Sequence, residues 1–335
     1  MKPYDVATHA LSRRGLILGS AALLAGCTRV GGGQAGRPTN TGSAEPMPPP
    51  TPALYRAPAE DALPAFKEAA GRFAQGLATY DPSDSAPSSA PPGEYLGVAE
   101  ELAAAAAPLV TPDHWSRADV EFVQYGGLTP VSTRATSGVA LVVLRQVLQA
   151  RRGGALVVRR TLDVRLRQRG GVWRVEALAS AGGTELERPA QLAAPAQQVL
   201  DDSRIDLTDS ARWDIYSGQI SPNLLRVMLR LADVTPLRTT VLKTGHPERV
   251  VDGRTSPPVS AHWRGQAVDI HSLGGVPIAD AAASVIRSVV ETAGADRDVS
   301  QVGAPPGFDL DAGGRRGFTN LVHADHLHIA VRRRT

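Results

Sequence analysis

Histidine is the residue type whose distribution along this chain most clearly indicates chemistry. The 335-residue sequence contains eight histidines, and six of them lie in its C-terminal third: His246, His262, His271, His323, His326 and His328. Imidazole nitrogen and carboxylate oxygen are donors that zinc favours, and a catalytic zinc keeps three protein ligands so that water can take the fourth position. The concentration of histidines therefore predicts a metal site in this part of the chain.

Most of these histidines fall into two short clusters. Residues 260–269 read Ser-Ala-His-Trp-Arg-Gly-Gln-Ala-Val-Asp, and residues 323–328 read His-Ala-Asp-His-Leu-His. Residues two apart on a strand point to the same face, so His326 and His328 can both reach one centre. Asp269 lies in an apolar, strand-like run, where an unpaired carboxylate would be costly to bury. Metal ligation would remove that cost.

The joint pattern of the two clusters resembles a known group of zinc enzymes. Ser-x-His-x-x-Gly-x-Ala-x-Asp, followed far downstream by His-x-His, is similar to the motifs of the D-alanyl-D-alanine metallopeptidases, the related murein endopeptidases and the Hedgehog-type domains. The match runs from Val241 to Val331. The resemblance implies an antiparallel-sheet zinc domain, which we place at residues 200–335. It also implies that Zn²⁺ is bound by His262, Asp269 and His328.

The same resemblance implies roles for the neighbouring polar residues. His326 falls on the first histidine of His-x-His, which in the family lies beside the metal and contacts substrate or transition state. Asp325 stands where the carboxypeptidases carry a catalytic glutamate, and His323 matches a further active-site histidine of the endopeptidases. The implied reaction is zinc-assisted peptide hydrolysis, in which Asp325 or His323 takes the proton and His326 stabilises the oxyanion. The identity of the general base stays open between these two residues.

The arginine with which the family binds its substrate has no counterpart at its usual place. The family segment Ser-Gly-Tyr/Phe-Arg corresponds here to Thr-Gly-His-Pro-Glu-Arg at residues 244–249, with Pro247 at the arginine position. Arg249 follows two residues later and is the candidate for substrate binding. Ser260 is a second candidate for this role and is also expected to make a local hydrogen bond.

Two functions follow from this pattern. A third is possible only if the match to the family motif arose by chance. The first is a zinc metallopeptidase that cuts peptidoglycan stem or crosslink peptides, as a D,D-carboxypeptidase or as an endopeptidase. The second is a catalytically inactive zinc site that binds wall peptide or a partner protein. The third is a structural envelope protein without metal.

The first residues of the chain predict export and a lipid anchor. Arg13-Arg14 precedes an apolar run from Leu16 to Ala25, which suits a secretory signal peptide and is too short to span a bilayer. The run ends in Leu-Ala-Gly-Cys, which resembles the lipobox of bacterial lipoproteins, with the single cysteine, Cys27, as the lipidated residue. We expect a lipoprotein signal peptide over residues 1–27 and anchorage to the outer face of the cytoplasmic membrane. The alternative is a cleaved signal peptide with an incidental cysteine, and the paired arginines raise the twin-arginine route as a hypothesis.

A linker and an α+β region are expected between this anchor and the histidine clusters. Residues 28–54 are rich in Gly, Pro, Thr and Ser, which predicts a disordered linker. Apolar residues recur at helical spacing from Leu63, and a second, alanine-rich helix is expected over 95–109. Four strand-like runs follow, at 120–125, 138–148, 155–167 and 172–177.

Helices followed by a meander of strands indicate an α+β domain over residues 55–190. This order resembles the nuclear-transport-factor-2-like cone, a helix-plus-curved-sheet fold. The segment 75–82 (Gln-Gly-Leu-Ala-Thr-Tyr-Asp-Pro) is similar to envelope accessory proteins of that fold. Because this region has no convergent set of His, Asp and Glu, it is expected to be a scaffold or binding module, with an envelope protein as a candidate partner.

The overall composition bounds these interpretations. The content of hydrophobic residues is 42%, enough for a sizeable core, and the length suggests two domains. The 36 basic and 33 acidic residues give a formal net charge of +3. This near balance argues against a nucleic-acid partner.

Overall fold

A computed structural model describes residues 47–82, 95–308, 310 and 316–332. The predicted signal peptide, its lipidation site Cys27 and most of the predicted linker lie outside the described residues. Within the described ranges, no helix is long and apolar enough to cross a membrane. This part of the chain combines helices with antiparallel and mixed sheets, which confirms the α+β class.

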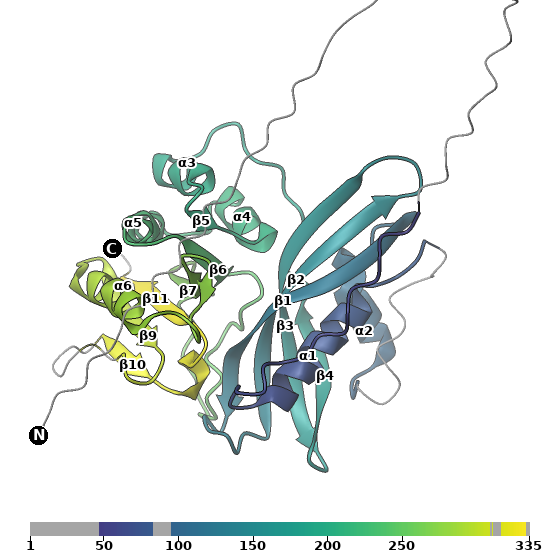
Figure 1. The fold of residues 1–335 in the computed structure, drawn as a ribbon, viewed down its shortest axis with the longest axis horizontal. Helices are drawn as coiled ribbons and strands as arrows, with labels where there is room; N and C mark the ends of the chain where they lie inside the picture. Colours follow the sequence, from purple (N-terminus) through teal and green to yellow (C-terminus); the bar gives the residue numbers. More distant parts are fainter. Residues whose placement is uncertain (1–46, 83–94, 309, 311–315, 333–335) are drawn as a thin grey trace, which may run out of the picture. The chain divides into compact units, whose positions relative to one another are not determined.

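Four long antiparallel strands form the first sheet, in the order β1-β2-β3-β4 (Figure 1). They are β1 (His114–Thr129), β2 (Ser137–Ala150), β3 (Ala155–Arg169) and β4 (Val172–Ser180). All four predicted strands are present, and each is longer than its apolar run because ladder pairing with a neighbour also holds the polar ends extended. Gly170 and Gly171, both at positive φ, form the turn between β3 and β4.

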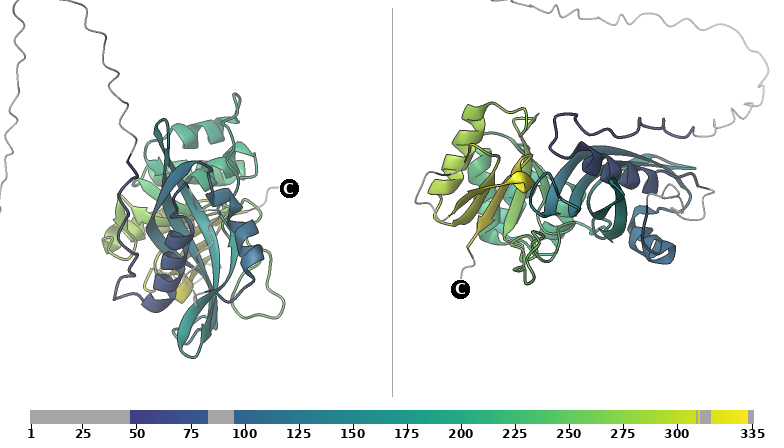
Figure 2. Two further views of the ribbon diagram at one scale, coloured as in Figure 1. Left: turned by 90° about the vertical axis from the view of Figure 1, so that its right-hand side faces the viewer. Right: turned by 90° about the horizontal axis from the view of Figure 1, so that it is seen from below.

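One helix covers a face of this sheet (Figures 1 and 2). The α1 helix spans Pro64–Leu77, close to the predicted start at Leu63, and its proline occupies the first turn, where no amide donor is needed. Its apolar side chains recur at helical spacing and are fully buried: Phe66, Ala70, Phe73, Ala74 and Leu77. They share a hydrophobic cluster with strand residues such as Leu162 and Val164. Full burial of each large side chain stabilises the fold by about 2 kcal/mol.

The second predicted helix is shorter than expected. It comprises α2 (Ala99–Ala106) and a single 3-10 turn, η1 (Ala107–Leu109). Tyr95, expected at its start, instead forms a β-bridge with Val175 of β4. Pairing with the sheet therefore overrides the helical periodicity at this end.

A second sheet of seven strands has the order β10-β9-β11-β7-β6-β5, with β8 beside β7 (Figure 1). Its strands are β5 (Ile205–Asp206), β6 (Leu237–Val241), β7 (Ala267–Leu273), β8 (Val276–Pro277), β9 (Val299–Ala304), β10 (Gly317–Thr319) and β11 (Leu327–Val331). The helices around it are α3 (Ala194–Asp201), α4 (Asp209–Tyr216), α5 (Pro222–Ala232), α6 (Ala283–Ala295) and the 3-10 turn η2 (Leu321–His323). The α4 helix was not predicted, because Ser210 and Asp214 on its buried side interrupt the apolar period.

The strands β7 and β11 bury alternate residues against the helices of this sheet. Val268 and Ile270 of β7 belong to one hydrophobic cluster with Leu327 and Ile329 of β11 and with residues of α5 and α6. Successive side chains on a strand point to opposite faces. The polar residues between these core positions therefore face away from α5 and α6, toward the first sheet.

Contacts between the two sheets join residues far apart in the sequence. We call residues 47–190 the N-terminal half and residues 191–332 the C-terminal half. The guanidinium of Arg159 lies 2.6 Å from Asp206, Glu121 lies 2.8 Å from Arg238, and Thr161 Oγ1 donates to the Thr240 carbonyl at 2.5 Å. These contacts help to join the described residues into one compact unit. The division into domains at 55–190 and 200–335 stays a prediction.

The carboxyl group of Asp163 on β3 predicts an unusual dependence of stability on pH. Its side chain is almost fully buried, Oδ1 has no hydrogen-bond partner among the described residues, and Oδ2 lies 3.4 Å from the half-exposed guanidinium of Arg165. Burial therefore raises the pKa of Asp163 to about 6. Because this pKa exceeds the unfolded value of about 3.9, the group favours folding most below about pH 4 and loses that contribution between about pH 4 and pH 6.

We expect Asp163→Asn to raise the free energy of unfolding at neutral pH by up to about 3 kcal/mol, and the gain to vanish below about pH 4. Urea unfolding at neutral and acidic pH measures this difference. The matched control is Asp119→Asn, which removes an exposed carboxylate from β1 and should change stability by less than about 0.5 kcal/mol. A loss of stability in Asp163→Asn at neutral pH would contradict the prediction.

Candidate metal centre

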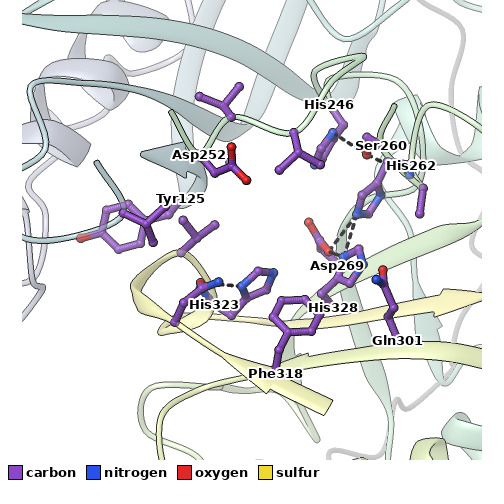
Figure 3. Close-up of a pocket in the computed structure, with 18 of the residues that line it drawn as sticks. Tyr125, His246, Asp252, Ser260, His262, Asp269, Gln301, Phe318, His323 and His328 are labelled. Carbon is purple, nitrogen blue, oxygen red and sulfur yellow. Dashed lines mark hydrogen bonds and ion pairs between the residues drawn. The ribbon is translucent and has the colours of Figure 1, made fainter. Parts of the chain in front are cut away.

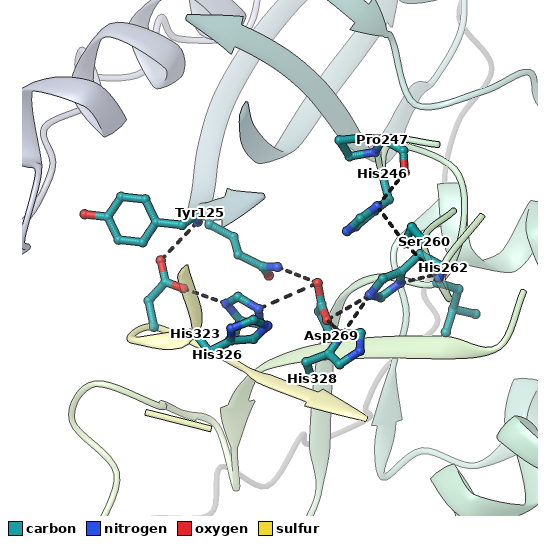
Figure 4. A network of polar contacts seen from close by, with 12 residues as sticks. Tyr125, His246, Pro247, Ser260, His262, Asp269, His323, His326 and His328 are labelled. Atoms are coloured by element: carbon teal, nitrogen blue, oxygen red, sulfur yellow. Dashed lines mark hydrogen bonds and ion pairs between the residues drawn. The ribbon is translucent and has the colours of Figure 1, made fainter. Parts of the chain in front are cut away.

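Two imidazoles and a carboxylate converge in the C-terminal half (Figures 3 and 4). His262 Nε2 lies 3.0 Å from Asp269 Oδ1 and 3.1 Å from His328 Nδ1. His328 Nδ1 lies 2.9 Å from the same carboxylate oxygen. A tetrahedral ion with bonds of about 2.0–2.1 Å holds its ligand atoms about 3.3 Å apart. The three atoms therefore stand at nearly the spacing that one metal ion requires.

Strand pairing brings two of these residues together. His328 of β11 is paired directly with Asp269 of β7 in the antiparallel ladder. Directly paired residues point to the same face of a sheet, with Cβ atoms about 5 Å apart. Because the neighbouring positions are buried against α5 and α6, Asp269 and His328 must both face the opposite side.

A tight turn before β7 positions His262. Its backbone N–H donates to Ser260 Oγ at 3.1 Å, and its carbonyl accepts from the N–H of Gly265 at 2.7 Å. Gly265 has φ +65°, and a Cβ there would collide with the Gln219 carbonyl oxygen, so glycine is required at this motif position. The ring is fixed by a 2.8 Å contact between Nδ1 and the Leu242 carbonyl. A carbonyl only accepts, so Nδ1 carries the proton and the lone pair of Nε2 faces the convergence point.

The charge of Asp269 is stabilised by its surroundings. Burial alone raises the pKa of this carboxyl, but the neighbouring imidazoles, first His262 and then His326 and His328, outweigh burial, so the pKa lies well below its usual value. Gln124 of β1 also donates from Nε2 to Asp269 Oδ2 at 2.6 Å. The N-terminal half therefore directly contacts a candidate metal ligand.

A third imidazole, that of His246, lies beside this convergence. One donor atom each from His246, His262 and Asp269 lie within 4.8 Å of one another, so this buried cluster can hold a metal ion. The rings of His246 and His262 stack with centroids 4.2 Å apart. Burial, and then His262, lower the pKa of His246 to about 3. Its Nδ1 donates to the Pro247 carbonyl at 2.9 Å, which leaves the Nε2 lone pair free.

His323 is oriented by Asn320 at the start of η2. His323 Nδ1 lies 2.8 Å from Asn320 Oδ1, which also accepts the backbone N–H of His323. Nδ1 is therefore the protonated nitrogen, and Nε2 has an unshared electron pair. Burial, followed by the charges of His326 and His328, lowers the pKa of His323 well below its usual value. The His323 ring is 5.7 Å from that of His328.

Asp325 holds His326 from behind the site. His326 Nδ1 lies 2.7 Å from Asp325 Oδ1, and His326 Nε2 lies 3.8 Å from Asp269 Oδ2. The other carboxylate oxygen of Asp325 lies 2.8 Å from the ammonium of Lys67 and accepts the Tyr125 N–H at 3.3 Å. Burial alone raises the pKa of Asp325, but Lys67 and His326 lower it further than burial raises it. Both oxygens of Asp325 are thus engaged.

Gly303 makes room for the histidines on the neighbouring strand. It is paired with His328 across the β9–β11 ladder. A Cβ at this position would lie 2.7 Å from His323 Cδ2, 2.9 Å from Phe318 Cζ and 3.0 Å from His328 Cβ. Any larger residue would therefore displace the rings.

A cavity of about 440 Å³ opens over the convergence point (Figure 3). The histidines that line it are His246, His262, His323, His326 and His328. Asp269 and Ser260 also line it, and Gly126 and Gly127 of β1 contribute part of its wall. Asp325 is not among the described lining residues. The structure therefore separates the two predicted general bases, because His323 faces the cavity and Asp325 lies behind His326.

Arg249 and His271 lie elsewhere. The guanidinium of Arg249 donates to the Pro257 carbonyl at 2.9 Å, and Arg249 lines a different hollow. The described cavity lining contains one guanidinium, that of Arg254, which lies 2.8 Å from Asp252. His271, on the same strand face as Asp269, is buried and stacks on Phe122 with centroids 4.6 Å apart. The structure thus does not bring Arg249 to the cavity.

Sequence reasoning assigned no role to four residues of this site. His246 was visible as one of six clustered histidines. Gln124, Lys67 and Asn320 carried no signal, because nothing in their local sequence marks them as neighbours of the histidines. No protein-family model matches the chain, and no curated protein matches its sequence.

Proposed function

We propose that the C-terminal half is a zinc-dependent peptidase that acts on peptidoglycan stem or crosslink peptides. The observation that carries this proposal is the convergence of His262, Asp269 and His328 at 2.9–3.1 Å on the floor of a histidine-lined cavity. Two imidazoles and one carboxylate form a ligand set of catalytic zinc sites that leave a position open. The motif resemblance supports the same assignment.

The two folds named from sequence are part of this proposal. A helix packed on four long strands is compatible with a nuclear-transport-factor-2-like cone over 55–190. The largely antiparallel second sheet is compatible with the D-alanyl-D-alanine peptidase and Hedgehog type over 200–335. We further propose export and anchorage through Cys27, which would place the site outside the cytoplasmic membrane near its substrate. The N-terminal half would then be free to contact an envelope protein.

The donor set fits zinc. His262 presents Nε2 and His328 presents Nδ1, and the ionised carboxylate of Asp269 supplies the negative charge. The Leu242 carbonyl and Gln124 hold His262 and Asp269 from outside, as is usual for metal ligands. When bound, zinc would acidify a water molecule and polarise the scissile carbonyl.

The surrounding histidines would divide the proton transfers and the charge stabilisation. His323 would accept the proton of the attacking water at Nε2, because Asn320 keeps its Nδ1 protonated and the ring faces the cavity. His326 would act as an imidazolium: its Nδ1–H is held by Asp325, and its Nε2–H would donate to the developing oxyanion. Asp325, one of the two bases considered from sequence, would orient His326 and take no proton from the water.

Among peptidases, the cavity favours cleavage of an internal bond. A carboxypeptidase must recognise the free C-terminal carboxylate of its substrate, for which arginine is the usual partner. In the described lining, the Arg254 guanidinium is already paired with Asp252, and Arg249 lies outside the cavity. We therefore propose an endopeptidase in preference to a D,D-carboxypeptidase.

The lack of an unpaired arginine in the described cavity lining also favours a second candidate function. A zinc-holding module that binds wall peptide without cutting it would need the ligands but not the family arginine. The closeness of His246 also favours this candidate, since four protein ligands would leave no position for water.

Hydrolysis of purified, crosslinked muropeptides distinguishes these functions. We expect the protein to hold about one zinc ion and to cut the crosslink, to lose activity on chelation and to regain it when zinc is added. Products are identified by mass spectrometry, and bound metal is measured by elemental analysis. A zinc-loaded but inert protein would support the binding module, and a protein without metal would overturn both functions.

A further inference from the structure

One charged side chain of the N-terminal half is buried next to the candidate centre. Lys67 lies on α1, and its side chain is only 3% exposed. Its ammonium lies 2.7 Å from Asp61 and 2.8 Å from Asp325. The other buried residues of α1 are mostly apolar, so a charge at this position is costly unless it is paired.

If Lys67 had only a structural role, the pairing with Asp61 would be enough, because both residues belong to the N-terminal half. The second carboxylate, Asp325, belongs to the C-terminal half and is directly bonded to His326. The aromatic rings of Tyr125 and Phe122 surround the ammonium, with centroids 4.5 Å and 5.6 Å away. The ammonium is therefore held in one place from several sides.

The resulting chain of contacts ends at the cavity. Lys67 holds Asp325 Oδ2, Asp325 Oδ1 holds His326 Nδ1, and His326 lines the cavity. The Tyr125 N–H supports the same carboxylate at the longer distance of 3.3 Å. Without Lys67, the Asp325 carboxylate would keep one weaker partner on that side and could rotate away from His326.

We propose that Lys67 is a positioning residue that acts through Asp325 to fix the ring of His326 in the peptidase site. This inference rests on the proposed function. It means that the C-terminal half does not carry a complete site alone, because α1 of the N-terminal half supplies the cation that orients His326. The N-terminal half would thus be more than a scaffold or a binding module.

The test compares Lys67→Met with a matched variant of the same helix in the full-length protein. Methionine keeps the length and apolar stem of lysine but removes the charge. We expect kcat for muropeptide hydrolysis to fall 10- to 100-fold, with KM and zinc content nearly unchanged. Arg72→Met removes a cation whose partner, Glu68, lies on α1 itself, and it should leave kcat unchanged.

Chemical rescue of a second variant tests the proposal if Lys67→Met does not fold. Lys67, Asp61 and Asp325 line a second cavity of about 440 Å³, through which a small amine can reach the site. We expect Lys67→Ala to lose activity and propylamine to restore part of it, whereas propanol should not. Equal activity of Lys67→Ala and the natural protein would overturn the proposal.

A readout independent of activity separates this inference from the proposed function. NMR of isotope-labelled histidine rings reports the hydrogen bond from His326 Nδ1 to Asp325. Loss of that signal in Lys67→Met but not in Arg72→Met supports positioning, even if the natural protein cuts no peptide. Retention of both the signal and kcat in Lys67→Met would overturn it, whether or not the peptidase function holds.

Discussion

Replacing His328 with alanine is expected to abolish metal binding and to reduce peptide hydrolysis at least about a thousandfold, because the loss of the metal removes several kcal/mol of transition-state stabilisation. His328 Nδ1 is one of the three donor atoms that converge within 3.1 Å of each other. Two remaining donors cannot hold a zinc ion as tightly as three. Elemental analysis and muropeptide hydrolysis measure the two effects.

The folded state should survive this substitution, because His328 is partly exposed at the cavity and does not belong to the hydrophobic cores. Chelation should lower the unfolding temperature of the natural protein, since free zinc at a thousand times its Kd stabilises the fold by about 4 kcal/mol. The same treatment should hardly affect His328→Ala. His114→Ala, which changes a histidine at the start of β1, is the matched control. Normal zinc content in His328→Ala would remove the basis of the proposed site.

Replacing His323 with alanine should lower kcat by about 10²- to 10⁴-fold while leaving zinc content unchanged. The physical reason is the loss of the Nε2 lone pair that faces the cavity, while the three converging donors remain in place. His323→Gln should be equally inactive, because an amide can form hydrogen bonds but does not accept a proton near neutral pH. The split between kcat and metal content is the decisive measurement.

A second histidine offers a clear alternative to this assignment. General-base catalysis contributes far more than a factor of about two to kcat. If kcat of His323→Ala stays within about twofold of that of the natural protein, the general base is therefore another residue. His246 is then the next candidate, because its Nε2 is also free and it lines the same cavity. The corresponding loss in His246→Ala, with zinc retained, would move the role of general base to His246. A loss of zinc in His246→Ala would instead identify it as a fourth ligand.

Much of the local structure was predictable from the sequence, because its causes are local. Leu63 and Phe66 begin an apolar period that α1 follows, and the glycine pair at 170–171 marks the turn between β3 and β4. The segment Ser221-Pro222 is typical of a helix start, and α5 begins at Pro222. The exceptions, the shortened α2 and the unpredicted α4, occur where sheet pairing or buried polar residues interrupt the period.

Only the locally determined features of the candidate site were predictable from the sequence. The residue types and spacing of His262, Asp269 and His328 indicated one centre, and alternation along strands explains why Asp269 and His328 share a face. No local signal could show that Asp325 lies behind His326 or that Arg249 lies outside the cavity. Those positions depend on how the turns between strands direct each side chain.

By itself, then, the sequence determined the α+β class, the main strands and helices, and the set of donors from which a metal site can be built. Only the tertiary structure decided that Gln124 contacts Asp269 and that Lys67 contacts Asp325. The reason is physical. Periodicity reports which face of an element is apolar, whereas contacts between two sheets depend on which of their faces meet, and no single segment of the chain encodes that.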